Sequence, residues 1–304
     1  MHTKIKYCDL QVNGSVGVDF SSPDLTDASF IKAVDHLTKS GTDCFLPTLI
    51  TSPLEIYEKN LKIIANAVAS SIGKHIPGVH IEGPFISDKP GSVGAHNPQW
   101  VQKPDIRLLE KLMEFSDGKV KLITIAAEAP GAENFCKEAV KMGITVSLGH
   151  QAASSEQLKR MAQAGATLLT HLGNGTPNVA GRHDNPILKA LAVKELAAMI
   201  ITDGFHLPPH VIEAIINAKG VDKVIVTSDA SPIAGLAPGR YDCLGNDAVL
   251  EPSGLLHNPE KECLVGSSFN IAQCADYLRK LKILSEEEIV KVTSENPRKF
   301  ISLS

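Results

Sequence analysis

Four side chains that can bind a metal ion or move a proton each close a short apolar run of the sequence. They are Glu82, His150, His171 and Asp229. The runs before them are rich in Val, Ile and Leu, which is typical of strands that are buried on both faces. In a parallel barrel the carboxyl ends of the strands converge on one face, so residues at four such ends would lie close together.

A carboxylate and two imidazoles form a good site for Zn2+ or a similar cation, with one position left open for water. We therefore expect Glu82, His150 and His171 to bind a divalent metal ion. Asp229 can then take a proton from an activated water molecule and give it to a leaving amine. Taken alone, a buried histidine is more often a hydrogen-bonded core residue, and a single aspartate is more often a helix N-cap. The combination of all four favours a hydrolytic site.

The rest of the sequence alternates strand-like and helix-like segments. Eight apolar runs are expected to be strands: residues 7–12, 44–49, 78–81, 120–126, 145–148, 167–170, 197–201 and 224–228. Helices are expected over residues 27–40, 52–70, 132–142, 154–164, 208–219, 268–281, 285–293 and 297–301. This alternation predicts an α/β fold, a (β/α)8 TIM barrel of the metal-dependent hydrolase type. We expect residues 1–304 to form this single domain.

Three segments are too long and too rich in Gly, Pro or Asn to be simple connections. They follow the third, sixth and eighth expected strands and comprise residues 83–103, 172–185 and 230–264. All three lie on the side of the barrel that carries the candidate ligands, where long loops are usually functional. The last one is expected to contain short β segments.

Composition argues against several other classes of protein. The chain of 304 residues carries a net charge of −4, whereas a nucleic-acid-binding protein usually has a basic face. No apolar run has the length that spans a bilayer, and residues 1–10 lack the apolar core of a signal peptide. The six cysteines are scattered without a C-x-x-C pair, which favours free thiols in a reducing compartment. We expect a cytoplasmic protein with a small-molecule substrate and neither a nucleic-acid nor a membrane partner.

The segments around the four residues resemble one enzyme family. They are residues 80–85 (HIEGPF), 94–98 (GAHNP), 147–150 (SLGH), 170–174 (THLGN), 203–206 (DGFH) and 226–230 (VTSDA). In this order they are similar to the N-acetylglucosamine-6-phosphate deacetylases of the amidohydrolase superfamily. Together with residues 9–14, 266–268 and 296–297, the resemblance covers nearly the whole chain.

The resemblance implies a role for each catalytic residue. Glu82, His150 and His171 match the metal ligands of the family, and Asp229 matches its catalytic acid/base. His96 matches the histidine that polarises the amide carbonyl. The expected reaction is therefore metal-dependent hydrolysis of an amide.

The resemblance also implies a set of substrate-binding residues. His206 and Arg182 match residues that hold the sugar phosphate, and Asn174 with Gly175 matches a segment at the same end of the substrate. Gln11, on the first strand, is included in this set. Family members are commonly homodimers, so we expect a homodimer in which Arg182 reaches the site of the partner.

The first strand bears on the number of metal ions. Many members of the superfamily carry His-x-His there for a second metal, whereas this chain has Gln11 and Asn13. Neither is a strong ligand, so one divalent metal ion is expected. Zn2+ is the first expectation, with Fe2+ and Co2+ as alternatives.

The chain departs from the family pattern in two places. The family normally has a small accessory β-sandwich, whereas this sequence is expected to form a bare barrel. The loop after the sixth strand reads HLGNGT and then RHDNP, and we expect Gly173 and Gly175 to enlarge or loosen it. The implied function is deacetylation of N-acetylglucosamine 6-phosphate. The alternatives are an amidohydrolase acting on another N-acyl amino sugar or a cyclic amide, and a non-catalytic sugar-binding barrel.

Overall fold

The chain folds around a barrel of eight parallel strands. The computed structural model describes residues 5–303. The strands follow one another in the order β1-β4-β5-β6-β7-β8-β9-β10, and a bridge between Val12 and Ala230 brings the two edge strands together. Their bounds are β1 Tyr7–Val12, β4 Thr42–Ile50, β5 Val79–Glu82, β6 Val120–Ile125, β7 Thr145–Leu148, β8 Leu168–Leu169, β9 Ala197–Ile201 and β10 Val224–Thr227. The eight predicted strands are confirmed, with bounds that differ by two residues at most.

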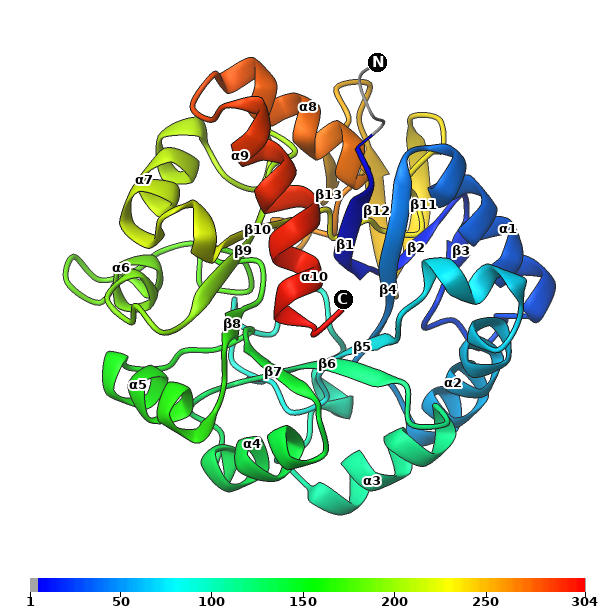
Figure 1. Cartoon of the computed structure of the whole chain (residues 1–304), viewed down its shortest axis with the longest axis horizontal. Coiled ribbons are helices and arrows are strands. Elements are labelled where there is room, and N and C mark those ends of the chain that lie inside the picture. The colour runs from blue at the N-terminus through cyan, green and yellow to red at the C-terminus, as the bar shows by residue number, and fades with distance from the viewer. Residues whose placement is uncertain (1–4, 304) are drawn as a thin grey trace.

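Helices surround the barrel (Figure 1). Their bounds are α1 Asp27–Lys39, α2 Leu54–Val68, α3 Ile106–Phe115, α4 Ala132–Lys141, α5 Ser155–Ala164, α6 Pro186–Leu191, α7 Pro209–Lys219, α8 Ile271–Leu281, α9 Glu286–Val290 and α10 Asn296–Phe300. A π-helical turn, Lys291–Glu295, joins α9 to α10. All the predicted helices are present. The sequence reading did not single out α3, whose N-cap Asp105 accepts from the backbone of Arg107, or the six-residue α6.

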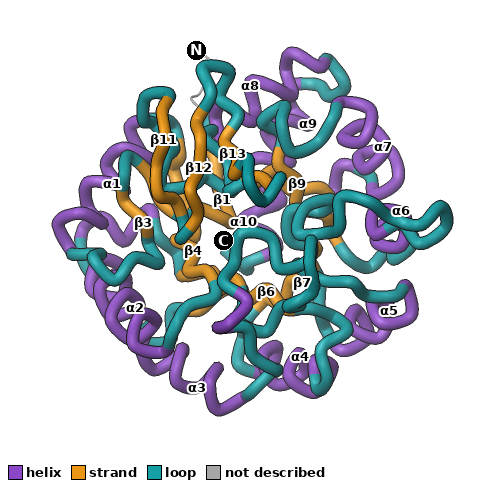
Figure 2. The backbone as a smooth tube through the Cα atoms, turned by 180° about the vertical axis from the view of Figure 1, so that it is seen from behind, coloured by secondary structure: helices purple, strands orange, loops and turns teal. Residues whose placement is uncertain are grey.

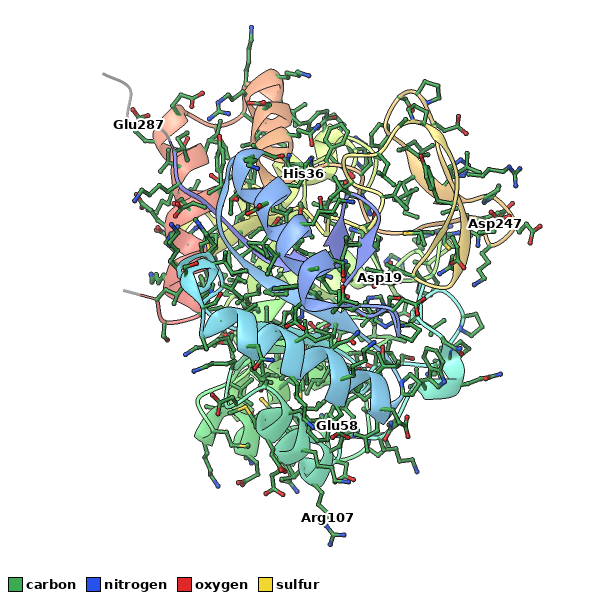
Figure 3. The ribbon with its side chains drawn as sticks, turned by 90° about the vertical axis from the view of Figure 1, so that its right-hand side faces the viewer. Asp19, His36, Glu58, Arg107, Asp247 and Glu287 are labelled. Atoms are coloured by element: carbon green, nitrogen blue, oxygen red, sulfur yellow. The ribbon has the colours of Figure 1, made fainter. Side chains whose placement is uncertain are left out.

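Two small antiparallel sheets lie outside the barrel. One pairs β2 (Gly14–Ser15) with β3 (Val18–Asp19). The other contains β11 (Gly239–Cys243), β12 (Asn246–Leu250), β13 (Leu256–Asn258) and β14 (Cys263–Leu264). This second sheet accounts for the β segments expected after the eighth strand. It projects beside the barrel, with Asp247 at its outer side (Figure 3). The accessory β-sandwich is not among the elements of residues 5–303.

Apolar side chains fill the space inside the barrel and the layer between the barrel and its helices. The inner cluster includes Leu10, Leu46, Leu122 and Ile225. Phe300 and Leu303 pack against this cluster, and α10 crosses the near end of the barrel in Figure 1. The long loops and the sheet β11–β14 lie on the opposite face (Figure 2). The chain terminus thus closes one end of the barrel and leaves the other for a site.

None of the helices in residues 5–303 is both long and apolar enough to cross a membrane.

Candidate active site

Three side chains converge at the carboxyl ends of β5, β7 and β8. Glu82 is the last residue of β5, and His150 and His171 each follow a strand by two residues. Glu82 Oε1 lies 3.1 Å from His150 Nε2 and 2.8 Å from His171 Nε2. The two Nε2 atoms are 3.1 Å apart. All three residues are buried. The structure therefore brings together the three residues that were expected to bind the metal.

The surroundings of these side chains fit a divalent metal ion. His150 Nδ1 donates to the carbonyl oxygen of Ser92 over 2.8 Å, which leaves the Nε2 lone pair for a metal. Gln11 Nε2 donates to Glu82 Oε1 over 2.8 Å and orients the carboxylate. Among the described residues, Gln11 Oε1 and His171 Nδ1 are buried polar atoms without a hydrogen-bond partner. Converging lone pairs and orphaned polar atoms are costly to bury unless a positive charge or a ligand balances them.

The charge of Glu82 also suits a cation. Burial raises the pKa of Glu82, but the close contacts with His150 and His171 outweigh that effect and leave the pKa well below its usual range. For His171, burial lowers the pKa, and the neighbouring Glu82 raises it by more. The carboxylate therefore stays ionised, which is the form that binds a metal.

Three of the four strand-end residues adopt an uncommon backbone conformation. The φ angle is 49° at His150, 28° at His171 and 52° at Asp229, all in the left-handed region. For residues other than glycine this conformation is uncommon and costs roughly 1–3 kcal/mol each, and such residues tend to cluster at functional sites. The turn redirects each side chain from the strand end toward the same point.

Asp229 lies two residues beyond β10, beside the cluster of Glu82, His150 and His171. Asn13 Nδ2 donates to Asp229 Oδ1 over 2.7 Å. Burial, and then the negative charge of Glu82, raise the pKa of Asp229 to about 6. A carboxyl group with such a pKa can both accept and release a proton near neutral pH.

His96 comes from the loop after β5 and is held in a defined tautomer. Its Nδ1 lies 3.3 Å from the backbone N of Thr51 and 2.9 Å from the hydroxyl of the same residue. A backbone N–H can only donate, so Nδ1 accepts and Nε2 carries the proton. Burial, and then His150, lower the pKa of His96 to about 3, so the ring is neutral. Its Nε2–H group lies 3.9 Å from Glu82 Oε2, at the edge of the cluster.

One cavity of about 1060 Å³ contains all five of these side chains. His206 and Asn174 also line it, and so does Gly175. Neither Gln11 nor Arg182 belongs to its wall. Gln11, which was expected among the substrate contacts, is fully buried beneath Glu82. Its amide binds the Glu82 carboxylate.

His206 is fixed by the aspartate three residues before it. Asp203 Oδ2 lies 2.7 Å from His206 Nδ1, and Asp203 Oδ1 accepts the backbone N–H of His206 over 3.0 Å. Burial raises the pKa of Asp203, but the hydrogen bond with His206 outweighs it, so the pKa lies well below its usual range. Ser267 donates its hydroxyl to the same carboxylate over 2.7 Å. This contact links residues 203–206 with residues 266–268.

The loop after β8 packs closely against the cluster. A Cβ added to Gly175, whose φ is +59°, would lie 2.8 Å from His150 Nδ1, and one added to Gly173 would lie 2.8 Å from Leu207 Cδ2. The expectation that these glycines loosen the loop is therefore wrong, because they permit close approach. The side chain of Asn174 donates to the carbonyl oxygen of His171 over 3.2 Å and stays in the cavity wall.

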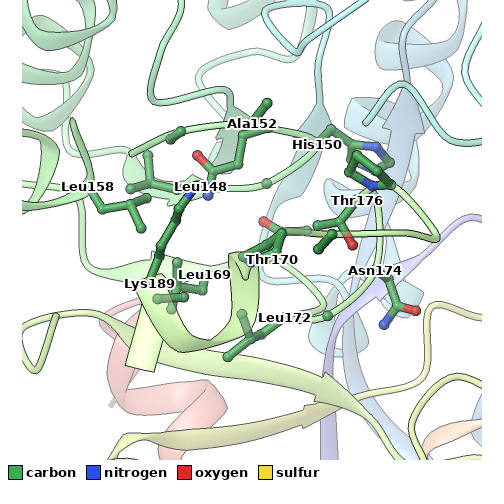
Figure 4. A pocket seen from close by; sticks show the side chains of 18 of the residues that line it. Leu148, His150, Ala152, Leu158, Leu169, Thr170, Leu172, Asn174, Thr176 and Lys189 are labelled. Carbon is green, nitrogen blue, oxygen red and sulfur yellow. The ribbon is translucent and has the colours of Figure 1, made fainter. Parts of the chain in front are cut away.

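A smaller cavity of about 160 Å³ lies behind this loop (Figure 4). Leucines 148, 158, 169 and 172 line much of it, and the loop residues Asn174 and Thr176 form one side together with His150. The side chain of Lys189 also lines it and pairs with Asp184. The loop therefore has an apolar inner wall behind the metal-binding histidine.

Comparison with known proteins shows the family to which this chain belongs. A curated N-acetylglucosamine-6-phosphate deacetylase from Bos taurus is 30% identical over 308 residues, which cover 98% of this chain and 74% of the relative. The chain belongs to the N-acetylglucosamine-6-phosphate deacetylase family. An N-acetylgalactosamine-6-phosphate deacetylase from Escherichia coli O157:H7 is 26% identical over 98% of this chain and 77% of its own length. No family model matches the chain.

A solved structure agrees with the fold of this family member. The crystal structure of N-acetyl-D-glucosamine-6-phosphate deacetylase from Mycobacterium smegmatis matches with a TM-score of 0.89 at 25% identity. The match covers 98% of this chain and 78% of that chain. The chain therefore spans about three-quarters of its relatives, and the shared part is the barrel.

Sequence reasoning missed two carboxylates that position the site of this deacetylase family member. Asp203 opens the DGFH segment and orients His206, a role that the segment alone does not indicate. Asp9 is buried and accepts hydrogen bonds from Thr227 Oγ1 and the backbone of Ser228, over 2.7 and 3.1 Å. It thus ties β1 to the strand end that carries Asp229. The signal available in the sequence is that both aspartates belong to segments that resemble the family, residues 9–14 and 203–206.

Two further histidines that stand near candidate site residues in the sequence lie away from the cluster. His80 points into the barrel interior, where its Nε2 lies 2.8 Å from Thr124 Oγ1 and its Nδ1 lies 3.1 Å from the carbonyl oxygen of Leu10. His183 is exposed on the loop between β8 and α6, as is Arg182. Neither histidine belongs to the metal-binding cluster.

Proposed function

We propose that the chain hydrolyses the acetyl amide of an N-acetylhexosamine 6-phosphate, and that N-acetylglucosamine 6-phosphate is its substrate. The products are acetate and the amino sugar phosphate. One observation carries the proposal: Glu82, His150 and His171 share a single cavity with Asp229 and His96. The names of the relatives support the choice of substrate.

The residues that would hold the metal are Glu82, His150 and His171, and we propose one Zn2+ ion per chain. Two imidazoles and one carboxylate suit this ion, and Fe2+ and Co2+ remain the alternatives. A bound divalent cation supplies a Lewis acid that acidifies a water molecule and polarises a carbonyl group. The amides of Gln11 and Asn13 occupy the first strand, where a second metal would need ligands.

Asp229 is the proposed acid/base. Asn13 holds Oδ1, so Oδ2 is the oxygen that exchanges protons with the reactants. It takes a proton as the water oxygen forms a bond to the carbonyl carbon. It then returns that proton to the nitrogen as the C–N bond breaks, so the carboxylate is regenerated.

His96 is the proposed partner of the carbonyl oxygen. Because the ring is neutral and Nδ1 accepts from Thr51, the Nε2–H group can donate to the oxygen as negative charge develops. The buried setting keeps this donor fixed before the reaction begins. Its contribution is therefore greatest in the transition state.

His206 and Asn174 are the proposed contacts of the sugar phosphate within one chain, with Gly175 providing a close backbone approach. Asp203 fixes His206 through Nδ1, which leaves Nε2 toward the cavity. Arg182 is exposed and does not line the cavity of its own chain. We therefore assign it to the partner's site in a homodimer.

The surface around Arg182 supports the homodimer. Val179 is 86% exposed and Leu188 is 62% exposed, and both belong to the segment from β8 to α6 that carries Arg182. Exposed apolar side chains that gather on one surface often mark an interface with another chain. Mixing Arg182→Ala and Asp229→Asn chains should restore activity, since the second chain can lend its Arg182 to the first. A monomer in solution, or no recovery on mixing, would contradict the assignment.

Compartment and domain organisation complete the proposal. All six cysteines are free, which supports a reducing compartment such as the cytoplasm. We treat residues 1–304 as one catalytic domain.

The test of function is acetate release from N-acetylglucosamine, N-acetylgalactosamine and the 6-phosphate of each. The highest kcat/KM is expected for N-acetylglucosamine 6-phosphate, and no acetate from any of the four would refute the proposal.

A further inference from the structure

The three long loops meet over the active-site cavity. Asn246 Nδ2 donates to the carbonyl oxygen of Ala95 over 3.1 Å and so joins the loop after β10 to the loop that carries His96. Asn178 Nδ2, from the loop after β8, donates to the carbonyl oxygen of Glu262 over 3.3 Å. The turn between β13 and β14, residues 259–262, therefore lies across the roof of the cavity. We call it the roof turn.

The roof turn presents one lysine, and that lysine is anchored at both ends. The backbone N of Lys261 donates to Asn258 Oδ1 over 3.1 Å, and its Nζ donates to Asn246 Oδ1 over 2.6 Å. Both asparagines are buried, at 4% and 3% exposure. Lys261 is an exposed residue by comparison, yet its position is set by two buried side chains. An ammonium group has three donors, so the bond to Asn246 leaves two for a ligand.

Lys261 also differs from the other cations near the site. Among the lysines and arginines of residues 5–303, it is the one that lines the active-site cavity. Lys89 and Arg182 belong to the other two long loops and are absent from the cavity wall. The wall also contains the carboxylates of Glu82, Asp229 and Glu262. An anionic substrate entering beside these carboxylates needs a nearby positive charge.

We propose that Lys261 binds the phosphate group of the substrate and makes the enzyme prefer phosphorylated sugars. The inference rests on the proposed function for the identity of the sugar. The reason to expect an anion at Lys261 comes only from the contacts of the roof turn and the charges that line the cavity. Lys261 is a specificity residue within the same chain, in addition to His206. The two donors left on Nζ would bind phosphate oxygens, which form strong charge-assisted hydrogen bonds.

Binding of the product pair tests the proposal without turnover. Calorimetry on the full chain would compare glucosamine 6-phosphate with glucosamine, for the parent, Lys261→Met and Lys261→Arg. We expect Lys261→Met to weaken binding of the phosphate by about 10- to 100-fold, the usual effect of losing a charged hydrogen bond. Binding of glucosamine should change less than about twofold, and Lys261→Arg should recover most of the loss.

A matched control is Lys89→Met, which removes the same charge from a neighbouring loop outside the cavity wall. The proposal is overturned if Lys261→Met weakens both ligands equally, if it weakens neither, or if Lys89→Met produces the same loss. The outcome is separate from that of the proposed function. If the parent releases no acetate but binds glucosamine 6-phosphate through Lys261, only the proposed function is refuted. If the parent releases acetate but its binding of glucosamine 6-phosphate does not depend on Lys261, only this inference is refuted.

Discussion

Gln11 donates its side-chain amide to the Glu82 carboxylate over 2.8 Å, from the strand position where a second metal ligand would otherwise be expected. The contact orients Glu82, one of the three proposed metal ligands. Gln11→Ala should therefore lower the affinity for the metal by about 10- to 100-fold, the usual effect of losing such a supporting bond. Competition with a chromophoric chelator measures this affinity. Exposed Gln102→Ala is the control, and an unchanged affinity in Gln11→Ala would refute the supporting role.

Asp229→Asn separates metal binding from proton transfer. Asparagine keeps the shape of the side chain and can still accept the hydrogen bond from Asn13, but it cannot take a proton. We expect the metal content of the parent and a kcat lower by about 10²- to 10⁴-fold. Metal analysis and acetate release on the same preparation check both parts. Turnover at the parent rate would show that another group is the base.

His96→Ala removes the N–H group that is proposed to donate to the carbonyl oxygen of the substrate. The expected result is a fall in kcat of about 10²- to 10³-fold with a much smaller change in KM, because the donor acts mainly when charge develops. Metal content should stay the same. Steady-state kinetics would be compared with those of exposed His210→Ala. Loss of metal, or a change confined to KM, would contradict the assigned role.

Asp19 gives the protein a pH-dependent stability that is separate from catalysis. It lies in β3 (Figure 3), and burial raises its pKa to about 6. A carboxyl group with a higher pKa in the folded state than in the unfolded state stabilises the fold when it is protonated and destabilises it when it is ionised. The destabilisation by Asp19 should therefore grow as the pH rises from about 4 to 6. Asparagine removes the charge and can keep the hydrogen bond from the Ser21 backbone.

Asp19→Asn should therefore raise the free energy of unfolding at pH 8 by about 1–2 kcal/mol, a figure reduced because the carboxyl is partly exposed. At pH 4 the gain should be close to zero. Urea unfolding at both values of pH measures it, with exposed Asp24→Asn as the control. A gain of equal size at both would exclude titration of Asp19 as its cause.

The sequence allowed the barrel and the metal-binding cluster to be predicted for the same reason. Strands buried on both faces have a strong apolar signal, and their carboxyl ends must converge once the barrel forms. Glu82, His150 and His171 therefore came together as the topology requires. The alternation of strands and helices in the sequence was therefore enough to predict that these three residues meet.

The supporting contacts could not be predicted because they depend on paths through loops. Asp203 reaches Ser267, and Asn246 reaches both Ala95 and Lys261, across gaps in sequence that no local pattern encodes. Arg182 is exposed and does not line the cavity of its own chain, so its expected role in the site of a partner depends on an interface between chains and not on a local pattern. Close packing of Gly175 on His150 likewise depends on three-dimensional approach.

The central claim is that one metal ion, held by Glu82, His150 and His171, is required for deacetylation. The most direct test strips the protein of metal, adds Zn2+ in steps, and measures acetate release from N-acetylglucosamine 6-phosphate at each step. Activity should start near zero, rise in proportion to bound metal, and reach its limit at one equivalent per chain. Full activity in the stripped protein, or no acetate release at one bound equivalent, would contradict the account.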